Sequence, residues 1–288
     1  MCRDLAFFLG MIRLMRKILT LCFAAFSLVP VWFATGVSAA PQLNGSPTQG
    51  GMLWGKVEPG TIILLDGSAV DVHESGVFAI GFGRDHVASA KLEYRYSDGK
   101  TEVQNIDVQP REFDIERVNG LPPKTVSPPP EWTARRKVEN GRVRSARAVM
   151  MPETQWVAGF QKPAEGRFSG FYGSQRILNG EPRSPHYGLD IAADVGTPIW
   201  APAGGVVRLA ASDFLLEGGI VIIDHGMGIT STLFHMNSVT VKEGARVTKG
   251  AEIGTVGAKG RANGPHVDWR VNWKNVRLDP MLVLEEEK

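Results

Sequence analysis

Apolar and polar residues alternate in short runs along residues 51–117, and turn-forming residues separate the runs. Six runs are rich in β-branched and aromatic residues, at 53–57, 61–65, 70–72, 77–80, 91–96 and 103–106. A period of two residues turns one face of a strand to the core and the other to solvent. The turn signals between the runs are EPG at 58–60, DG at 66–67, SG at 75–76 and DG at 98–99. The pattern predicts a small N-terminal β-sandwich-like domain.

The pattern changes in the middle of the chain. LPP at 121–123 and PPP at 128–130 predict a stiff linker, because consecutive prolines favour extended polyproline II geometry. Residues 131–150 combine a few apolar positions with many charges, which indicates a helix. We expect its basic side chains to form a solvated face; they are Arg135, Arg136, Lys137, Arg142, Arg144 and Arg147.

Strand patterns return after about residue 160, at 204–207, 219–223 and 230–234. The sequence DHGMG at 224–228 has the glycines of a hairpin turn, so we interpret His225 as a turn residue rather than a metal ligand. The chain is therefore predicted to be mainly β. Its expected parts are a leader at 1–39, a β domain at 40–117, a linker and helix at 118–152 and a second β domain at 153–288.

The first 39 residues have the layout of a secretory signal peptide. Basic residues precede an apolar run at 18–33, and small residues at 37–39 offer a cleavage site after Ala39. A membrane anchor is the alternative, but the run is short for a full span. The prediction is export across the inner membrane to the periplasm or cell envelope.

Charge and cysteine content change the picture little. Arg3, Arg13, Arg16, Lys17 and Asp4 lie in the predicted leader, so its removal changes the formal charge from +2 to about −1. This balance gives no reason to expect a nucleic-acid partner. Both cysteines also lie in the leader, so we expect no disulfide in the mature chain. The oligomeric state is not predicted.

Two segments carry residues suited to a metal site. SPHYGLDIAA at 184–193 and GPHVDWR at 264–270 are each predicted to be a short strand. Residues i and i+4, or i and i+2, share one face of a strand. His186 would therefore point to the same side as Asp190, and His266 to the same side as Asp268. A catalytic zinc site needs three protein ligands and an open position. The two segments supply three ligands and one spare group for acid–base chemistry.

Between and around these segments the chain resembles the lysostaphin/LytM-type zinc endopeptidases that cut peptidoglycan peptides. The resemblance covers about 166–284, somewhat under half the chain. Its motifs are FYGSQR at 171–176, HxxxD at 186–190, GTPIWAP at 196–202, DHG at 224–226, FHM at 234–236 and GPH at 264–266. It implies a C-terminal antiparallel β catalytic domain of the LytM type.

The resemblance also implies roles for individual residues. His186, Asp190 and Asp268 would hold Zn²⁺, and His266 would take a proton from the attacking water. His235 would face that water, and would either donate a hydrogen bond to the developing oxyanion or share the proton transfer. The chain departs from the commonest family pattern at Asp268, where a second histidine normally follows two residues after His266. A carboxylate oxygen is a legitimate zinc ligand, but it makes the metal less electrophilic. The departure therefore bears on activity more than on metal binding.

The function implied is a secreted zinc-dependent endopeptidase that hydrolyses cross-links or stem peptides of peptidoglycan in cell-wall remodelling. Two alternatives stay open. One is a weakly active or inactive LytM-like protein that binds the wall and activates an amidase; the other is a structural wall-binding module whose metal stabilises the fold. Peptidoglycan is the expected partner, and divisome proteins or amidases are candidate partners.

Overall fold

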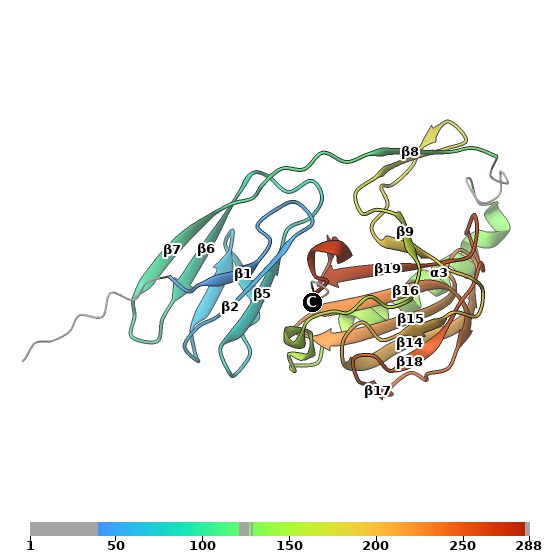
Figure 1. The fold of residues 1–288 in the computed structure, drawn as a ribbon. Coiled ribbons are helices and arrows are strands. Elements are labelled where there is room, and N and C mark those ends of the chain that lie inside the picture. The colour runs from blue at the N-terminus through green and yellow to red at the C-terminus, as the bar shows by residue number, and fades with distance from the viewer. Residues whose placement is uncertain (1–39, 121–126, 128, 286–288) are drawn as a thin grey trace, which may run out of the picture. The chain divides into compact units, whose positions relative to one another are not determined.

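The computed structural model describes residues 40–120, 127 and 129–285. The predicted leader at 1–39 and most of the predicted linker at 121–130 lie outside these residues. Residues 40–288 form one compact unit, so the domain boundaries at 117 and 153 stay predictions. Among the described residues, no helix has the length and apolar character needed to cross a membrane. The architecture is mainly β, as the sequence predicts, with small N-terminal sheets, one α-helix and one large C-terminal sheet (Figure 1).

Two small antiparallel sheets make up the N-terminal part. The strands of the first are, in sheet order, β1 (Leu43–Gly45), β2 (Met52–Lys56) and β5 (Val77–Gly81). The strands of the second are β4 (Ser68–Val70), β3 (Ile62–Leu65), β6 (Ser89–Arg95) and β7 (Thr101–Asp107). Phe78 from the first sheet meets Tyr94 from the second edge to face, with ring centroids 6.3 Å apart. Both rings are fully buried, so the sheets enclose a common core.

The large C-terminal sheet is antiparallel throughout its main path, β17-β14-β15-β16-β19-β12-β9. The bounds of these strands are β9 (Arg167–Gly170), β12 (Leu189–Ala192), β14 (Gly205–Phe214), β15 (Gly218–Gly226), β16 (Ile229–Val239), β17 (Arg246–Val247) and β19 (His266–Trp273). Three further strands extend the sheet: β18 (Glu252–Val256) pairs with β16, β13 (Pro198–Trp200) pairs with β18, and β20 (Val276–Leu278) pairs with β19. Every residue of β15 is buried, because both faces of this strand are covered.

The helix α3 (Pro130–Ala148) covers one of these faces (Figure 1). Ala146 packs in a cluster with apolar residues of β14, β15 and β16, namely Leu209, Phe214, Ile220, Ile222 and Phe234. The expectation of a solvated basic face is wrong for several residues. Arg136 is largely covered and pairs with Glu217, and Arg147 donates to Thr232 Oγ1 at 2.9 Å. Arg142 is exposed as expected, although it pairs with Glu243 at 2.8 Å. Their guanidinium groups contact the sheet and its loops. Few apolar side chains of α3 pack on the sheet, so these polar contacts supply much of its remaining attachment.

A short strand from the N-terminal part joins the C-terminal part. β8 (Ile115–Val118) pairs in parallel with β10 (Gln175–Leu178), which pairs in turn with β11 (Glu181–Pro182). Apolar side chains of β5, β19 and β20 also share one cluster. Gly81 allows this contact, since a Cβ there would lie 2.8 Å from Leu278 Cδ2. The two short 3₁₀ helices are η1 (Gln155–Ala158) and η2 (Pro280–Leu282).

Candidate functional site

Two aspartates form the floor of the candidate site. Asp190 on β12 and Asp268 on β19 are direct partners in the antiparallel ladder. Like charges directly opposite each other on one face of a sheet repel. Both residues are buried, which strengthens the repulsion because water screens it less. An arrangement of this kind requires cations to balance it.

His186 joins the two aspartates, although not from a strand as predicted. β12 begins only at Leu189. His186 lies in the preceding segment, where its backbone N–H donates to Ser174 O at 2.9 Å and its carbonyl accepts from Gly173 N–H at 2.7 Å. Pro185 precedes it, and proline has no N–H to give to a ladder. The turn around residue 173 therefore positions this side chain.

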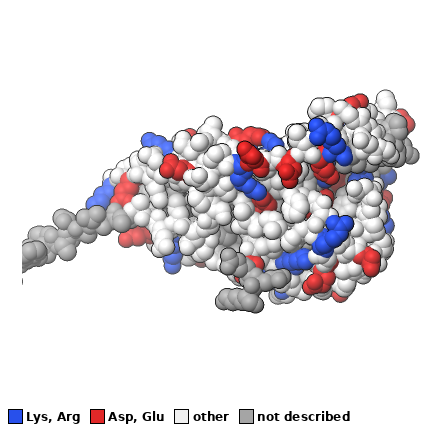
Figure 2. Space-filling model, turned by 45° about the horizontal axis from the view of Figure 1, so that its top comes forward, with Lys and Arg blue, Asp and Glu red and all other residues white. Residues whose placement is uncertain are grey.

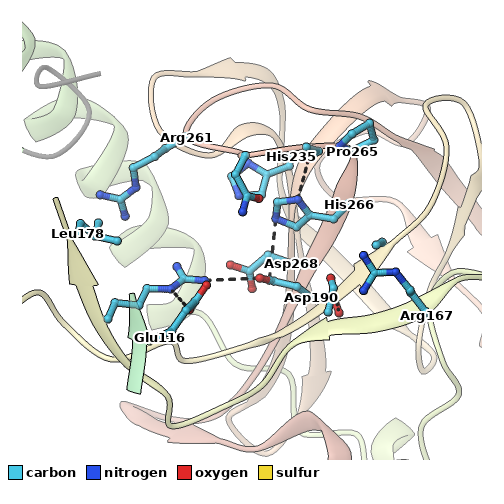
Figure 3. Close-up of a pocket in the computed structure, with 14 residues that line it drawn as sticks. Glu116, Arg167, Leu178, Asp190, His235, Arg261, Pro265, His266 and Asp268 are labelled. Atoms are coloured by element: carbon cyan, nitrogen blue, oxygen red, sulfur yellow. Dashed lines mark hydrogen bonds and ion pairs between the residues drawn. The ribbon is translucent and has the colours of Figure 1, made fainter. Parts of the chain in front are cut away.

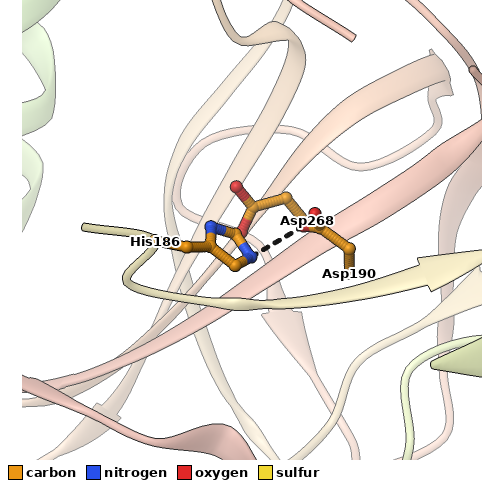
Figure 4. Close-up of side chains that lie close together, drawn as sticks. All are labelled: His186, Asp190 and Asp268. Carbon is orange, nitrogen blue, oxygen red and sulfur yellow. Dashed lines mark ion pairs between the residues drawn. The ribbon is translucent and has the colours of Figure 1, made fainter. Parts of the chain in front are cut away.

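The three side chains converge on one point (Figure 4). One ligand atom from each of His186, Asp190 and Asp268 lies within 4.8 Å of the others, and the three could hold a metal ion. His186 Nε2 is 3.0 Å from Asp190 Oδ1, yet these two atoms lack hydrogen-bond geometry. Among the described residues, neither they nor His186 Nδ1 has a hydrogen-bond partner. Buried polar atoms without partners are costly, and a divalent cation would satisfy the two that face each other.

Two glycines leave room for the carboxylates. A Cβ on Gly170 would lie 2.4 Å from Asp190 Oδ2, and a Cβ on Gly188 would lie 2.2 Å from Asp268 Oδ1. Both distances are far shorter than any tolerable contact. Gly170 is also the ladder partner of Asp190 on β9. Any other residue at these positions would displace a candidate ligand.

Each carboxylate is held by a different arginine. Arg270 binds Asp268 through Nε, 3.0 Å from Oδ1 and 3.1 Å from Oδ2, and through Nη2, 2.6 Å from Oδ2. Arg176 Nη2 lies 3.5 Å from Asp190 Oδ2, and Arg176 Nε donates to Glu116 at 3.0 Å. Burial alone would raise the pKa of Asp268, but the charge of Arg270, with that of His186 and the bonds from Arg270, holds this pKa well below its usual range. Asp268 is therefore an anion across the neutral range.

Two histidines lie beside the triad. The rings of His235 and His266 are 4.8 Å apart, and His266 Nε2 is 3.9 Å from Asp190 Oδ1. His266 Nδ1 is 2.9 Å from Gly264 O, and His235 Nδ1 is 2.8 Å from Lys259 O. A carbonyl oxygen only accepts, so Nδ1 carries the proton in each ring. When such a ring is neutral, the lone pair on its Nε2 is left to act as a base.

His235 adopts a backbone conformation that L-residues seldom use. Its φ is +61°, and the ladder of β16 is irregular just after it, between Met236 and Ser238. Strained residues of this kind concentrate at functional sites, where the surrounding structure holds them in place. Burial lowers the pKa of His235, and the charge of Asp268 opposes that effect only partly. The ring is therefore neutral near pH 7.

The site opens into a cleft with a volume of about 380 Å³ (Figure 3). Asp190, Asp268, His235 and His266 line it. Four charged side chains also line it: Glu116, Arg167, Arg176 and Arg261. Lys and Arg are interspersed with Asp and Glu over the face of the molecule drawn in Figure 2.

Other residues of the sequence motifs are structural. His225 is fully buried, its Nδ1–H donates to Gly204 O at 2.7 Å, and its ring meets Phe160 edge to face. It is the last residue of β15 but one, beside Gly226 and Met227, both with positive φ, and the three side chains that could hold a metal do not include it among the described residues. Trp269 is also fully buried and donates to Ser231.

Sequence reasoning missed several groups that shape the site. They are Glu116, Gly170, Arg176, Gly188 and Arg270. The position of Arg270, two residues after Asp268 on the same strand, is a signal that could have found it, because residues i and i+2 share a face. Glu116 left no such signal, since it reaches the cleft only through the pairing of β8 with β10.

Comparisons with known proteins agree with this geometry. Residues 184–280 match the model of Peptidase family M23. A 98-residue stretch is 37% identical to the peptidoglycan DD-endopeptidase ShyC of Vibrio cholerae, covering 34% of this chain and 22% of that protein. A 103-residue stretch is 33% identical to the cell division protein DipM of Caulobacter vibrioides, covering 34% of this chain and 17% of DipM. The match thus spans about a fifth of the length of these relatives.

A solved structure is similar over a longer range. It is a crystal structure of a Pseudomonas aeruginosa protein assigned to peptidase M23, with a TM-score of 0.64 and 29% sequence identity. The similarity covers 83% of this chain and 95% of that one. It therefore extends well beyond the stretch at 184–280 that matches the family model.

Proposed function

The chain is a member of peptidase family M23 over residues 184–280, and we propose that it is a zinc-dependent endopeptidase that hydrolyses cross-links or stem peptides of peptidoglycan. The single observation that carries the proposal is the convergence of His186, Asp190 and Asp268 beside His235 and His266, whose Nδ1 atoms are bonded to carbonyl oxygens. A metal site alone would need only the first three. The second pair supplies the acid–base groups that hydrolysis requires.

Zinc, when bound, lowers the pKa of water and polarises a carbonyl group. His186, Asp190 and Asp268 would hold it. The buried atoms of His186 and Asp190 that lack partners fit a cation, as does the space left by Gly170 and Gly188. The oxygens of Asp268 are also bonded to Arg270, so Asp268 would be a weaker zinc ligand than a free carboxylate.

His266 would accept the proton of the attacking water at Nε2, the ring nitrogen that is not bonded to Gly264 O. His235 would share this proton and pass it to the leaving amine. The lowered pKa of His235 favours proton sharing over a permanent positive charge. A stable hydrogen bond from His235 Nε2 to a developing oxyanion would need that charge, so we assign proton transfer to it.

The proposed substrate class rests on family membership and on the cleft. The relative ShyC is by name a peptidoglycan DD-endopeptidase. The arginines along the cleft (Figure 3) would suit a peptide with carboxylate groups. We further propose export by the predicted leader at 1–39 and a place of action in the periplasm or cell envelope, with cell-division proteins or amidases as candidate partners.

A paired measurement tests the proposal. Metal content of the purified mature chain is determined by plasma mass spectrometry, and release of soluble fragments from purified peptidoglycan sacculi is followed before and after chelation. We expect about one zinc per chain, fragment release that chelation stops, and recovery when zinc is added. Zinc without release would reject the enzyme, and a chain that binds no zinc would reject the metal site as well.

A second candidate is favoured by one observation. Both oxygens of Asp268 are bonded to Arg270, which weakens the third ligand. A weakly active or inactive protein that binds the wall and activates an amidase would tolerate this. Such a protein would bind sacculi without cutting them and would raise the rate of an added wall amidase, whereas the endopeptidase would release fragments by itself.

A further inference from the structure

The Asp268–Arg270 pair is the most unusual feature of the candidate site. Two nitrogen atoms of one guanidinium group bond both carboxylate oxygens at 2.6 to 3.1 Å. The guanidinium carbon also lies 4.6 Å from the centre of the Phe234 ring. Phe234 is the ladder partner of Asp268 on β16, so the ring and the carboxylate together fix Arg270. Arg270 does not line the cleft among the described residues, and acts on the site through Asp268.

The pair has a consequence for the charge of the triad. Catalytic zinc sites usually combine neutral imidazoles with at most one carboxylate. His186, Asp190 and Asp268 contain two carboxylates, which would cancel the two positive charges of zinc. Arg270 returns one positive charge beside the second carboxylate. Since both oxygens of Asp268 touch it, the compensation is local to this ligand.

We propose that Asp268 and Arg270 act as one unit that takes the electrostatic place of a neutral third ligand. Arg270 is then a positioning residue that offsets the charge of Asp268, and its guanidinium keeps the site electrophilic enough to deprotonate water. The proposal rests on the zinc site of the proposed function. It departs from the simpler expectation that a histidine at position 268 would by itself improve the site.

The directions of change follow from the charges. Arg270→Gln makes the site more negative and frees Asp268, so it should bind zinc more tightly and need a higher pH for hydrolysis. Asp268→His leaves the guanidinium without its anion beside the metal, so it should bind zinc more weakly. The double variant, Asp268→His with Arg270→Gln, removes both charges. Its zinc affinity and the pH dependence of its hydrolysis should therefore be close to those of the natural chain.

The test uses the four full-length mature chains, stripped of metal, with zinc affinity measured by competition against a chromogenic chelator. We expect Kd about tenfold lower for Arg270→Gln, about tenfold higher for Asp268→His, and within about threefold of the natural chain for the double variant. On the acidic side of the pH–rate profile, the pH at which the rate is half its maximum should be higher for Arg270→Gln than for the natural chain. In the double variant this pH should return to the natural value. An arginine with a purely structural role would instead weaken zinc binding when it is lost.

Two controls separate charge from fold. Arg270→Lys keeps the positive charge but loses the two-nitrogen contact with Asp268 and the stacking on Phe234. Its Kd should fall by less than the roughly tenfold expected for Arg270→Gln, which also tests the proposal if Arg270→Gln does not fold. Arg208 binds the buried Asp224 through Nε at 3.1 Å and Nη2 at 2.8 Å, outside the lining of the cleft. Arg208→Gln should therefore lower stability without changing zinc affinity.

The outcomes distinguish this inference from the proposed function. Weaker zinc binding in Arg270→Gln, or a double variant worse than both single variants, would overturn the inference and leave the zinc enzyme intact. The expected Kd pattern in a chain that cuts no sacculi would uphold the inference and reject the enzyme. A natural chain that takes up no zinc would overturn both.

Discussion

Asp190 and Asp268 lie directly opposite each other on β12 and β19, and a different arginine binds each carboxylate. The positive charges of Arg176 and Arg270 offset part of the repulsion between these two buried anions. This arrangement underlies the predictions below.

His186→Ala should weaken zinc binding by more than about 100-fold, because even groups that only orient a ligand contribute 10- to 100-fold. The measurement is the zinc content of the dialysed mature chain, which should fall from about one ion to almost none. His225→Ala is the matched control, since His225 is equally buried and bonds Gly204 O. If both variants kept their zinc, His186 would not be a ligand.

His266→Ala should keep its zinc yet lose about 10²- to 10⁴-fold in kcat, the usual contribution of a general base. His73→Ala serves as the control, because the His73 ring bonds the nearby Ser75 and His73 is not among the described residues that line the cleft. Loss of zinc from His266→Ala would make His266 a ligand and move Asp268 out of that role.

His235→Ala should also keep its zinc and lose activity in the same range. An additional effect is expected here, because φ of +61° is strained for an L-residue. His235→Gly should therefore be more stable than His235→Ala toward urea, by up to about 1 kcal/mol. Equal stability of the two variants would mean that the strain is relieved in the unliganded chain.

The pKa of His225 is lowered to about 4, because burial penalises its charged form more than its bond to Gly204 and the charge of Asp224 favour that form. The unfolded chain binds this proton near pH 6.5 and the folded chain does not. Stability from neutral His225 is thus fully present above pH 6.5 and is lost as pH falls toward 4, by an amount on the order of 3 kcal/mol.

His225→Asn, which can still donate to Gly204 O, isolates this effect. Urea unfolding of both chains is measured from pH 7.5 to 4.5. The natural chain should be more stable at pH 7.5, because its ring packs on Phe160, and its advantage should shrink as pH falls. Curves that run parallel over this range would show that His225 does not titrate on unfolding.

Ala146→Lys should lower the free energy of unfolding by about 2–4 kcal/mol, because it places a charged side chain against the apolar face of β14 and β15. Ser145→Lys introduces the same residue at the neighbouring exposed position and should change stability by less than about 0.5 kcal/mol. Equal effects would mean that Ala146 of α3 does not pack against the large sheet.

The sequence predicted the strand positions of Asp190, His266 and Asp268, because a period of two residues fixes which side chains share a face. It placed His186 on a strand wrongly, since that side chain is positioned by backbone bonds to Gly173 and Ser174, which no periodic pattern records. The N-terminal strands follow the alternation closely.

Contacts between distant segments account for the remaining differences. The local sequence pattern predicts a solvated face for the basic residues of α3. Their partners, such as Glu217 and Glu243, lie about 80 to 100 positions later in the chain, so this pattern does not reveal them. Glu116 reaches the cleft for the same reason. The assignment of the metal ligands and catalytic histidines stays a prediction that the variants above test.

The pairing of β8 with β10 also has a consequence for the order of folding. Ile115 is aligned with Gln175, so the chain must close a loop of about 60 residues before this edge of the cleft exists. Closing so long a loop costs more entropy than forming a hairpin such as β15–β16. In a refolding experiment with pulsed hydrogen exchange, the amides of β16 should become protected first, and those of β8 should follow only after the sheet beneath the cleft has assembled.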